Sequence, residues 1–392
     1  MTALSLAGGI ILARALGPEG RGQLAAAMMW PGLVGALCSL GLQHAFAYAS
    51  GAGWCSPASL NRLAARYSVV VGLPITVLFL LACPYLYEKS FPGATWLPAI
   101  FALSIPVSLY SGLLMPIYQG RGDFARWNRA KLLRSGGWTC GIGTLVVLGA
   151  ATVLSFLVAQ IIVLSVVGAY LALGLRSRTR AEQERPAPFR RLLQYGLAVY
   201  ASGLAYMVNQ QLDQLCLSIW VAPAELGQYA TAVTVSSLLL FIPGVIGPIA
   251  FARLARGEEG GSGLKTSSGE ALWLGAGTLI PAGIALSLLG PWVVRLLYGG
   301  SFEEAGALLR VLAPAAMFLG LGNILSDILR GVGRPMLATY GMLGGAVVTV
   351  AGLAYTLPRY GIWGAAWVSL VAYALMAVGQ GVLAWKHLGA RS

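Results

Sequence analysis

Charged residues are scarce in this sequence. Asp, Glu, Lys and Arg make up 10% of its 392 residues, whereas soluble globular domains carry about 25%. This shortage excludes an ordinary water-soluble enzyme. The chain is instead 57% hydrophobic, with a mean hydropathy of +0.75. Long apolar runs follow one another from end to end, which predicts an all-α, polytopic membrane protein rather than a transmembrane β-barrel.

Metal ligands and nucleophiles are scarce as well. The chain has two His, and its five Cys are scattered without a Cys-x-x-Cys pair, so we expect no metal site, no disulfide framework and no cofactor. No GxxxxGK[ST] motif is present, which argues against nucleotide binding. The longest expected outer loops, 88–94 and 291–304, contain no His, Cys or Asp. We therefore expect no catalytic residues, and a membrane-bound polymerase or acyltransferase is disfavoured.

The apolar runs predict twelve membrane spans. The longest run, 135–175, would form a helix about 60 Å long, twice the hydrocarbon thickness of a bilayer, so we divide it near Gly149. The other expected spans are 2–16, 24–49, 67–87, 95–118, 192–221, 226–252, 271–290, 305–329, 336–357 and 361–385.

Basic residues outnumber acidic ones, 26 to 13, and they are distributed unevenly between the two sides of the predicted membrane. Alternate loops place 20 of the 26 on one side and 6 on the other. Cytoplasmic loops carry the excess of Lys and Arg in membrane proteins. The count predicts that both termini are cytoplasmic, and it explains the net positive charge without a nucleic-acid partner.

The chain divides into two similar halves. The polar segment 176–191 predicts a basic cytoplasmic linker between a six-helix lobe at 1–175 and a second six-helix lobe at 192–392. Three short segments recur in order and at equivalent places. They pair Gly22-Gln23 with Gly227-Gln228, Pro31–Gly35 with Pro243–Gly247, and Gln119–Asp123 with Arg330–Arg334. Because six is even, the halves form a parallel repeat about an axis along the membrane normal, which is typical of carriers.

The first span is short. Its 15 apolar residues, 2–16, barely cross a bilayer, and the repeat places the counterpart of Leu192 before residue 1. We expect that the first helix is truncated, either because the true start lies upstream or because it is naturally shorter. A cleaved signal peptide is disfavoured, since no basic segment precedes the apolar run.

Three motifs indicate a known family. Arg14-Ala-Leu-Gly-Pro-Glu-Gly-Arg-Gly-Gln23 closes the first span, Leu212-Asp213 precedes Glu225-Leu-Gly-Gln-Tyr229, and Leu329-Arg-Gly-Val-Gly-Arg-Pro335 ends the tenth. Together they resemble the polysaccharide-biosynthesis flippases of the multidrug/oligosaccharidyl-lipid/polysaccharide exporter superfamily.

The resemblance implies a flippase for undecaprenyl-diphosphate-linked oligosaccharides in the bacterial plasma membrane. It also implies contact with membrane lipids, and a polysaccharide polymerase and glycosyltransferases as pathway partners. The alternative is a cation-coupled multidrug antiporter of the same superfamily. Inward-facing arginines would favour the anionic lipid diphosphate, whereas an acidic, aromatic cavity would favour cationic drugs. A structural scaffold is a third alternative, and it is disfavoured because it would give the polar residues inside the spans no function.

Polar residues inside spans are the candidate binding groups, because placing a charge there costs about 2.5–3.5 kcal/mol. Asn209, Gln210 and Asp213 belong to the densest polar stretch, in the seventh span, and Asn209 and Asp213 share one helix face. We expect this face to line an aqueous cavity, with Asp213 binding a proton or cation or the sugar hydroxyls. The alternative is an interhelical polar contact that only holds the helices together.

A second pair, Asn323 and Asp327, repeats this spacing in the tenth span. Asn323 is a candidate substrate ligand and Asp327 a candidate coupling residue, although Arg330 is close enough to form a simple ion pair with Asp327.

Two arginines are candidate ligands for the diphosphate. Arg14, in the last turn of the first span, either binds the diphosphate bidentately or reaches the lipid headgroups. Arg121 begins a cytoplasmic basic cluster that either captures the diphosphate or sets topology by attracting anionic lipids. The other members of this cluster are Arg126, Arg129, Lys131 and Arg134.

Overall fold

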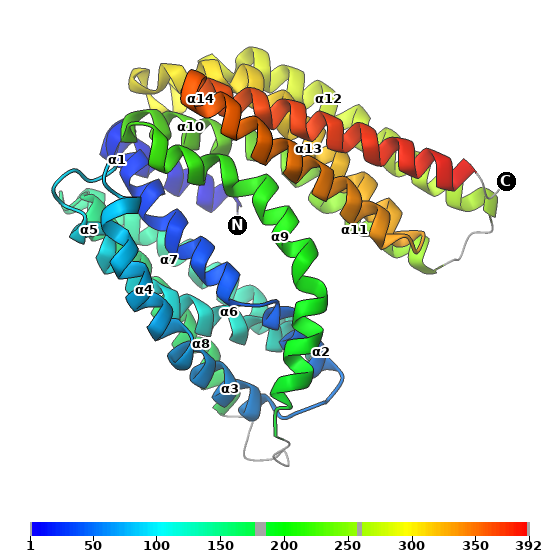
Figure 1. The fold of residues 1–392 in the computed structure, drawn as a ribbon, viewed down its shortest axis with the longest axis horizontal. Helices are drawn as coiled ribbons and strands as arrows, with labels where there is room; N and C mark the ends of the chain where they lie inside the picture. Colours follow the sequence, from blue (N-terminus) through cyan, green and yellow to red (C-terminus); the bar gives the residue numbers. More distant parts are fainter. Residues whose placement is uncertain (1, 177–185, 257–260, 390–392) are drawn as a thin grey trace. The chain divides into compact units, whose positions relative to one another are not determined.

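The all-α fold is confirmed. The structure is a computed structural model that describes residues 2–176, 186–256 and 261–389 (Figure 1). Over these ranges the chain is almost entirely helical and contains no β-strand. Seven of the described helices are long and apolar enough to cross a membrane, or up to eight if one bent pair counts as a single span. The chain is therefore a multi-pass membrane protein.

The first half of the chain contains nine helical segments within residues 2–176. They are α1 (Thr2–Cys38), α2 (Leu42–Gly51), α3 (Pro57–Val70), α4 (Gly72–Leu86), α5 (Trp96–Ala99), the 3-10 helix η1 (Ile100–Leu103), α6 (Ser104–Gly120), α7 (Phe124–Val147) and α8 (Val153–Arg176).

The second half contains eight helical segments over its described residues. They are α9 (Phe189–Trp220), α10 (Pro223–Ser236), η2 (Ser237–Leu240), α11 (Phe241–Arg256), α12 (Gly261–Tyr298), η3 (Gly300–Phe302), α13 (Glu303–Gly331) and α14 (Pro335–Gly389).

The turn expected inside the run 135–175 is present. α7 ends at Val147, Gly149 adopts a positive φ of 69°, and α8 begins at Val153. The hydroxyl of Thr152 accepts a hydrogen bond from the Ser155 backbone N–H at 3.2 Å. This contact caps the start of α8, so a flexible residue ends one span and a capping residue starts the next.

Two expected loops are instead single-residue breaks, each between two helices that carry one label. Gly17 (φ 67°, ψ −177°) interrupts α1, and Gly361 (φ 51°, ψ −130°) interrupts α14. Glycine adopts positive φ at little cost, and Pro18 suits the first turn of the helix that follows. The polar residues at 18–23 therefore continue a helix rather than form a loop.

Two other spans, which the sequence predicts to be continuous, are interrupted in the structure. The run 24–49 bends by 53° between α1 and α2 at Leu40 and Gly41, both of which have positive φ. The third span begins at Pro57, ten residues earlier than expected, and is interrupted at Val71. Arg62 and Arg66 consequently lie within helix α3.

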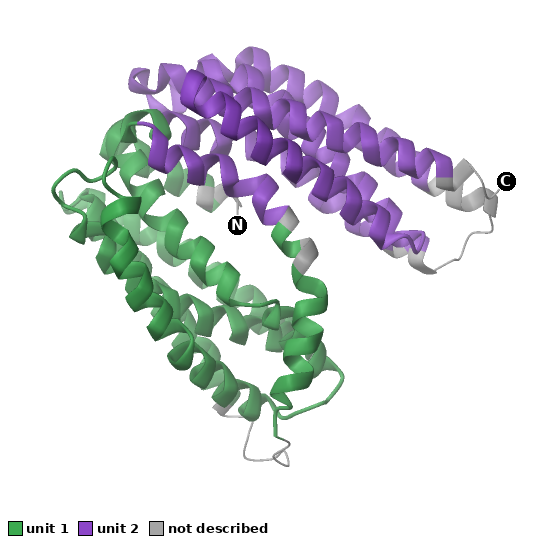
Figure 2. Ribbon diagram, viewed as in Figure 1, with its two compact units in different colours: residues 1–204, 222–227 green, residues 205–221, 228–392 purple. Residues whose placement is uncertain are grey.

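The described chain forms two compact units (Figure 2). Unit 1 comprises residues 1–204 and 222–227, and unit 2 comprises 205–221 and 228–392. In unit 1, α6 packs against α2, α3 and α8, and in unit 2, α13 packs against α11, α12 and α14. The lobes at 1–175 and 192–392 and the linker at 176–191 stay predictions, and most of that linker, 177–185, lies outside the described residues.

Within unit 1, the segments 18–22 and 223–227 cross without room for a side chain. A Cβ added to Gly22 would lie 1.7 Å from the Pro223 carbonyl oxygen, and one added to Gly227 would lie 1.9 Å from the Pro18 carbonyl oxygen. The contact is reciprocal. The two glycines that the sequence repeat pairs therefore occupy equivalent places in it.

Candidate functional site

Helix α9 buries two polar side chains one turn apart in unit 2. Asn209 is 3% exposed and Asp213 is 5% exposed, although both lie in a largely apolar bundle. They lie on the same face of α9, as the four-residue spacing predicts. Their partners come from α10 and α14, so this face is closed by two other helices.

Asp213 accepts hydrogen bonds from three neutral donors. The Tyr229 hydroxyl of α10 donates to its Oδ2 at 2.6 Å, and the Ser369 hydroxyl of α14 donates to the same oxygen at 3.3 Å. The Gln214 backbone N–H donates to Oδ1 at 2.7 Å. In the part of the chain that the structure describes, none of these partners is a cation, so the carboxylate lies buried without an opposite charge.

Asn209 connects α9 to both arms of the kinked helix α14. Its Nδ2 donates to the Met342 carbonyl oxygen at 2.9 Å, and its Oδ1 accepts from the Thr349 hydroxyl at 3.5 Å, both before the break at Gly361. Beyond the break, the Tyr373 hydroxyl donates to the Asn209 carbonyl oxygen. We call this group the α9 polar cluster. Its members are Asn209, Asp213, Tyr229, Thr349, Ser369 and Tyr373.

Within the described residues, the other predicted site residues of unit 2 are not hydrogen-bonded to this cluster. Gln210 is half-buried and donates to the Tyr206 hydroxyl at 2.9 Å. Asn323 is half-buried in α13. Asp327 forms an ion pair with Arg330 at 3.3 Å, which is the simple pair that their spacing suggested.

Arg14 and Arg121 belong to unit 1, and both are exposed. Arg14 lies three residues before the break in α1, and Arg121 caps the end of α6. Parts of the neighbouring basic cluster are engaged in packing. Arg126 donates to the Gly174 carbonyl oxygen at 2.8 Å, and the Lys131 ammonium lies 3.4 Å from the Trp127 ring centroid. Arg126 thus connects the start of α7 to the end of α8, whereas the Lys131 contact lies within α7.

A family comparison identifies the chain. Residues 11–307 match the family described as "Polysaccharide biosynthesis protein". The chain belongs to this family. The match confirms the resemblance drawn from the motifs around Arg14 and Asp213.

Solved structures confirm the fold of this polysaccharide-biosynthesis family member. An inward-facing multidrug resistance MATE family transporter of the MOP superfamily matches with a TM-score of 0.78 and 18% identity, over 100% of this chain and 95% of that chain. The lipid II flippase MurJ, in an inward closed conformation, matches with a TM-score of 0.77 and 14% identity, over 97% of this chain and 85% of that chain. At these identities the likeness establishes the fold alone.

A curated relative matches over a shorter region. An uncharacterised membrane protein of Methanocaldococcus jannaschii is 25% identical over 194 residues, which are 49% of this chain and 38% of that protein. The match thus spans less than two fifths of the relative's length.

Sequence reasoning missed most of the groups that surround Asp213 and Asn209. Thr349, Ser369 and Tyr373 are ordinary hydroxyl residues within apolar runs, and such residues are common in membrane helices. Tyr229 is the last residue of the family motif Glu225–Tyr229, which marks it as a residue of interest. Nothing in the sequence, however, indicates that its hydroxyl reaches Asp213. Among the described residues, no group of three or more His, Cys, Asp or Glu is arranged to hold a metal ion.

Proposed function

We propose that this protein is a flippase that moves an undecaprenyl-diphosphate-linked oligosaccharide from the inner to the outer leaflet by alternating access. The family match and the fold shared with a lipid II flippase support a lipid-linked substrate. The observation that carries the proposal is the α9 polar cluster, because a buried carboxylate inside a membrane bundle is costly and marks a functional pathway by default. The prenyl tail would stay in the bilayer throughout.

Substrate binding uses two kinds of group. Amides such as Asn209, Gln210 and Asn323 donate to and accept from sugar hydroxyls. The planar guanidinium groups of Arg14 and Arg121 suit bidentate hydrogen bonding to the oxygens of a diphosphate. The amides are thus assigned to the sugar and the arginines to the diphosphate.

Asp213 is the proposed coupling residue. Its charge is buried among neutral donors, so a proton or a monovalent cation that neutralises it would relieve the cost of burial. Ser369 bonds Asp213 and Thr349 bonds Asn209 one turn away on α9. Binding of a proton or cation to Asp213 would therefore affect both arms of α14. Asp327 is the weaker coupling candidate, since Arg330 already neutralises it.

The proposed setting follows from the substrate. The protein would lie in the bacterial plasma membrane, where undecaprenyl-linked intermediates are made on the cytoplasmic side. Glycosyltransferases that build the unit and a polymerase that consumes it outside are the expected pathway partners.

Flipping of a fluorescent undecaprenyl-diphosphate sugar in proteoliposomes tests the proposal. Wild-type protein should translocate the lipid, Arg14→Ala should abolish translocation, and Asp213→Asn should slow it and remove its dependence on an ion gradient. Gln211→Ala is the matched control, because Gln211 lies on the same helix but is exposed. Flipping that is unaffected by both Arg14→Ala and Asp213→Asn would contradict the assigned roles.

A cation-coupled multidrug antiporter is the second candidate. The observation that favours it is the same buried carboxylate, together with the fold shared with a MATE transporter. This candidate expects proton- or sodium-coupled efflux of cationic dyes that Asp213→Asn abolishes. Such efflux without lipid flipping would overturn the flippase proposal.

A further inference from the structure

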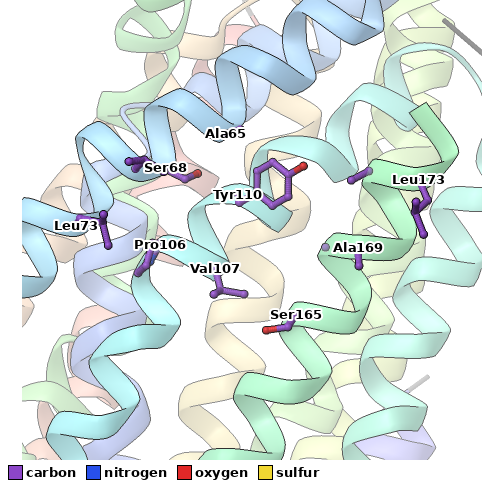
Figure 3. A pocket seen from close by; sticks show the side chains of 12 residues that line it. Ala65, Ser68, Leu73, Pro106, Val107, Tyr110, Ser165, Ala169 and Leu173 are labelled. Carbon is purple, nitrogen blue, oxygen red and sulfur yellow. The ribbon is translucent and has the colours of Figure 1, made fainter. Parts of the chain in front are cut away.

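Unit 1 contains a cavity of about 580 Å³ between three membrane spans (Figure 3). One wall is formed by α3 and α4, the second by α6 and the third by α8. Ser68, Tyr110 and Ser165 contribute hydroxyls, and the remaining lining side chains are apolar. The volume falls in the range of about 300–1,000 Å³ that is typical of small-ligand sites.

Close helix packing at one side and small residues on another shape this cavity. The third span is interrupted at Val71, where Gly72 packs so closely on Pro106 that an added Cβ would lie 3.0 Å from the Pro106 Cα. On α8, Gly168 and Ala169 face the space. The Tyr110 ring is held in place because its hydroxyl donates to Asn61 Oδ1 at 2.8 Å. The largest side chain of the lining is therefore fixed and does not fill the cavity.

The rim of the cavity is apolar and exposed. Val69 is 56% exposed, Leu73 is 48% exposed and Leu173 is 62% exposed. They belong to the candidate membrane spans 57–86 and 153–175. Exposed apolar side chains of a membrane span contact lipid chains, so the chemistry of this rim suits a hydrocarbon chain.

One end of the cavity is marked by positive charge. Arg62, Ala65 and Val69 follow one face of α3, and Ala65 and Val69 line the cavity. Arg62 therefore lies one turn beyond the lining, towards the start of α3, and exposed Arg66 is beside it. The distribution of Lys and Arg predicts that this end of α3 is cytoplasmic, where anionic headgroups are concentrated.

We propose that this cavity binds one acyl chain of an anionic phospholipid of the cytoplasmic leaflet, with the lipid phosphate at Arg62 and Arg66. The acyl chain fills the space between α3–α4 and α8, and Arg62 and Arg66 select the headgroup. This lipid site lies within unit 1 and is independent of the transported substrate.

Photo-crosslinking tests the site. The full chain is placed in nanodiscs that contain phosphatidylglycerol with a diazirine in one acyl chain, and the labelled peptides are mapped after illumination. Labelling should concentrate on α3, α4 and α8 around Val69, Leu73 and Leu173. Ala169→Phe, which fills the cavity, should abolish this labelling. Val166→Phe on the same helix is the matched control, since Val166 is 53% exposed and is outside the lining.

The headgroup is tested with the same probe on phosphatidylcholine. Wild-type protein should prefer phosphatidylglycerol, and Arg62→Gln and Arg66→Gln should each reduce this preference about fivefold. If Ala169→Phe does not fold, Leu173→Trp at the exposed rim should reduce labelling instead. Equal labelling of both lipids, labelling that survives these cavity substitutions, or displacement of the probe by equimolar undecaprenyl phosphate would overturn the proposal.

Discussion

Tyr229 donates the shortest of the three hydrogen bonds that Asp213 accepts, at 2.6 Å. Tyr229→Phe should lower the free energy of unfolding by about 0.6 kcal/mol and by no more than about 1.7 kcal/mol, the average and the largest value found for hydrogen bonds between membrane helices. Denaturation of the detergent-solubilised protein measures this change. Tyr360→Phe is the control and should have little effect, because Tyr360 is 62% exposed.

A double-mutant cycle separates this hydrogen bond from general packing. In an Asp213→Asn background, Tyr229→Phe should cost less than it does in the wild type, because the charged acceptor is gone. An equal cost in both backgrounds would show that the Tyr229 hydroxyl acts through something other than Asp213.

The sequence predicts the centre of the candidate site better than its surroundings. Asn209 and Asp213 are identifiable because amides and carboxylates are rare in apolar spans, and the helical repeat places them on one face. The Tyr373 hydroxyl, by contrast, bonds the backbone carbonyl of Asn209 across 164 positions of the chain. A backbone acceptor leaves no trace in the sequence, so only the folded structure reveals this contact.

At the scale of helices, the crossing of segments 18–22 and 223–227 makes Gly22 and Gly227 sensitive positions. Gly22→Ala or Gly227→Ala should destabilise the protein by about 1–3 kcal/mol, the usual cost of overpacking, because a carbonyl oxygen occupies the place of the new Cβ. Thermal unfolding in detergent measures this loss.

The controls for this crossing are Gly32→Ala in α1 and Gly244→Ala in α11, where a new Cβ meets nothing within 4 Å. These changes should be neutral or stabilising by about 0.5–1 kcal/mol, as expected for Gly→Ala within a helix. Equal effects at all four positions would mean that the close approach is not what constrains Gly22 and Gly227.

Gln228 stabilises the start of α13 from outside that helix. Its Nε2 donates to the Ser301 carbonyl oxygen at 2.7 Å, and its Oε1 accepts from the Ala305 backbone N–H at 3.0 Å. Gln228→Met keeps the length of the side chain but leaves the buried Ala305 N–H and the Ser301 carbonyl oxygen without this partner, so it should cost about 1–3 kcal/mol of stability. The same substitution at exposed Gln211 should cost far less, and denaturation of both variants decides the point.

Helix boundaries were the least predictable part of the fold. The turn at Gly149 was predicted because the run 135–175 is too long for one span. Gly17 and Gly361 are expected to lie in or beside loops, yet each is a one-residue break with a helix on both sides. At Gly361 the chain turns back on itself, since Gly341 and Gly352 of the first arm of α14 pack against Gln380 and Val368 of the second. Polarity at 18–23 indicates where a span ends, but it does not distinguish a solvated loop from the exposed first turn of the next helix.

At the scale of the whole molecule, the number of spans and the orientation of the chain are linked. Twelve spans, as the sequence predicts, would place both termini on one side, and the 20-to-6 distribution of Lys and Arg predicts that this side is cytoplasmic. A missed span would exchange the two sides for every later loop and would reduce the imbalance. The orientation therefore depends on features spread over the entire chain rather than on one loop.

Cysteine labelling tests this orientation. In a background without the five native cysteines, Glu88→Cys should react with a membrane-impermeant maleimide added to intact cells, because residues 88–94 are expected to lie outside. Arg334→Cys should react only after the membrane is permeabilised. Both positions are exposed in the structure, so folding does not hide them. If Arg334→Cys reacts in intact cells, residue 334 lies outside, on the side opposite to the one predicted. A span missed or wrongly added between residues 88 and 334 would explain such a result. If Glu88→Cys is also protected in intact cells, the cytoplasmic positions assigned to Arg62, Arg66 and Arg121 would have to be revised as well.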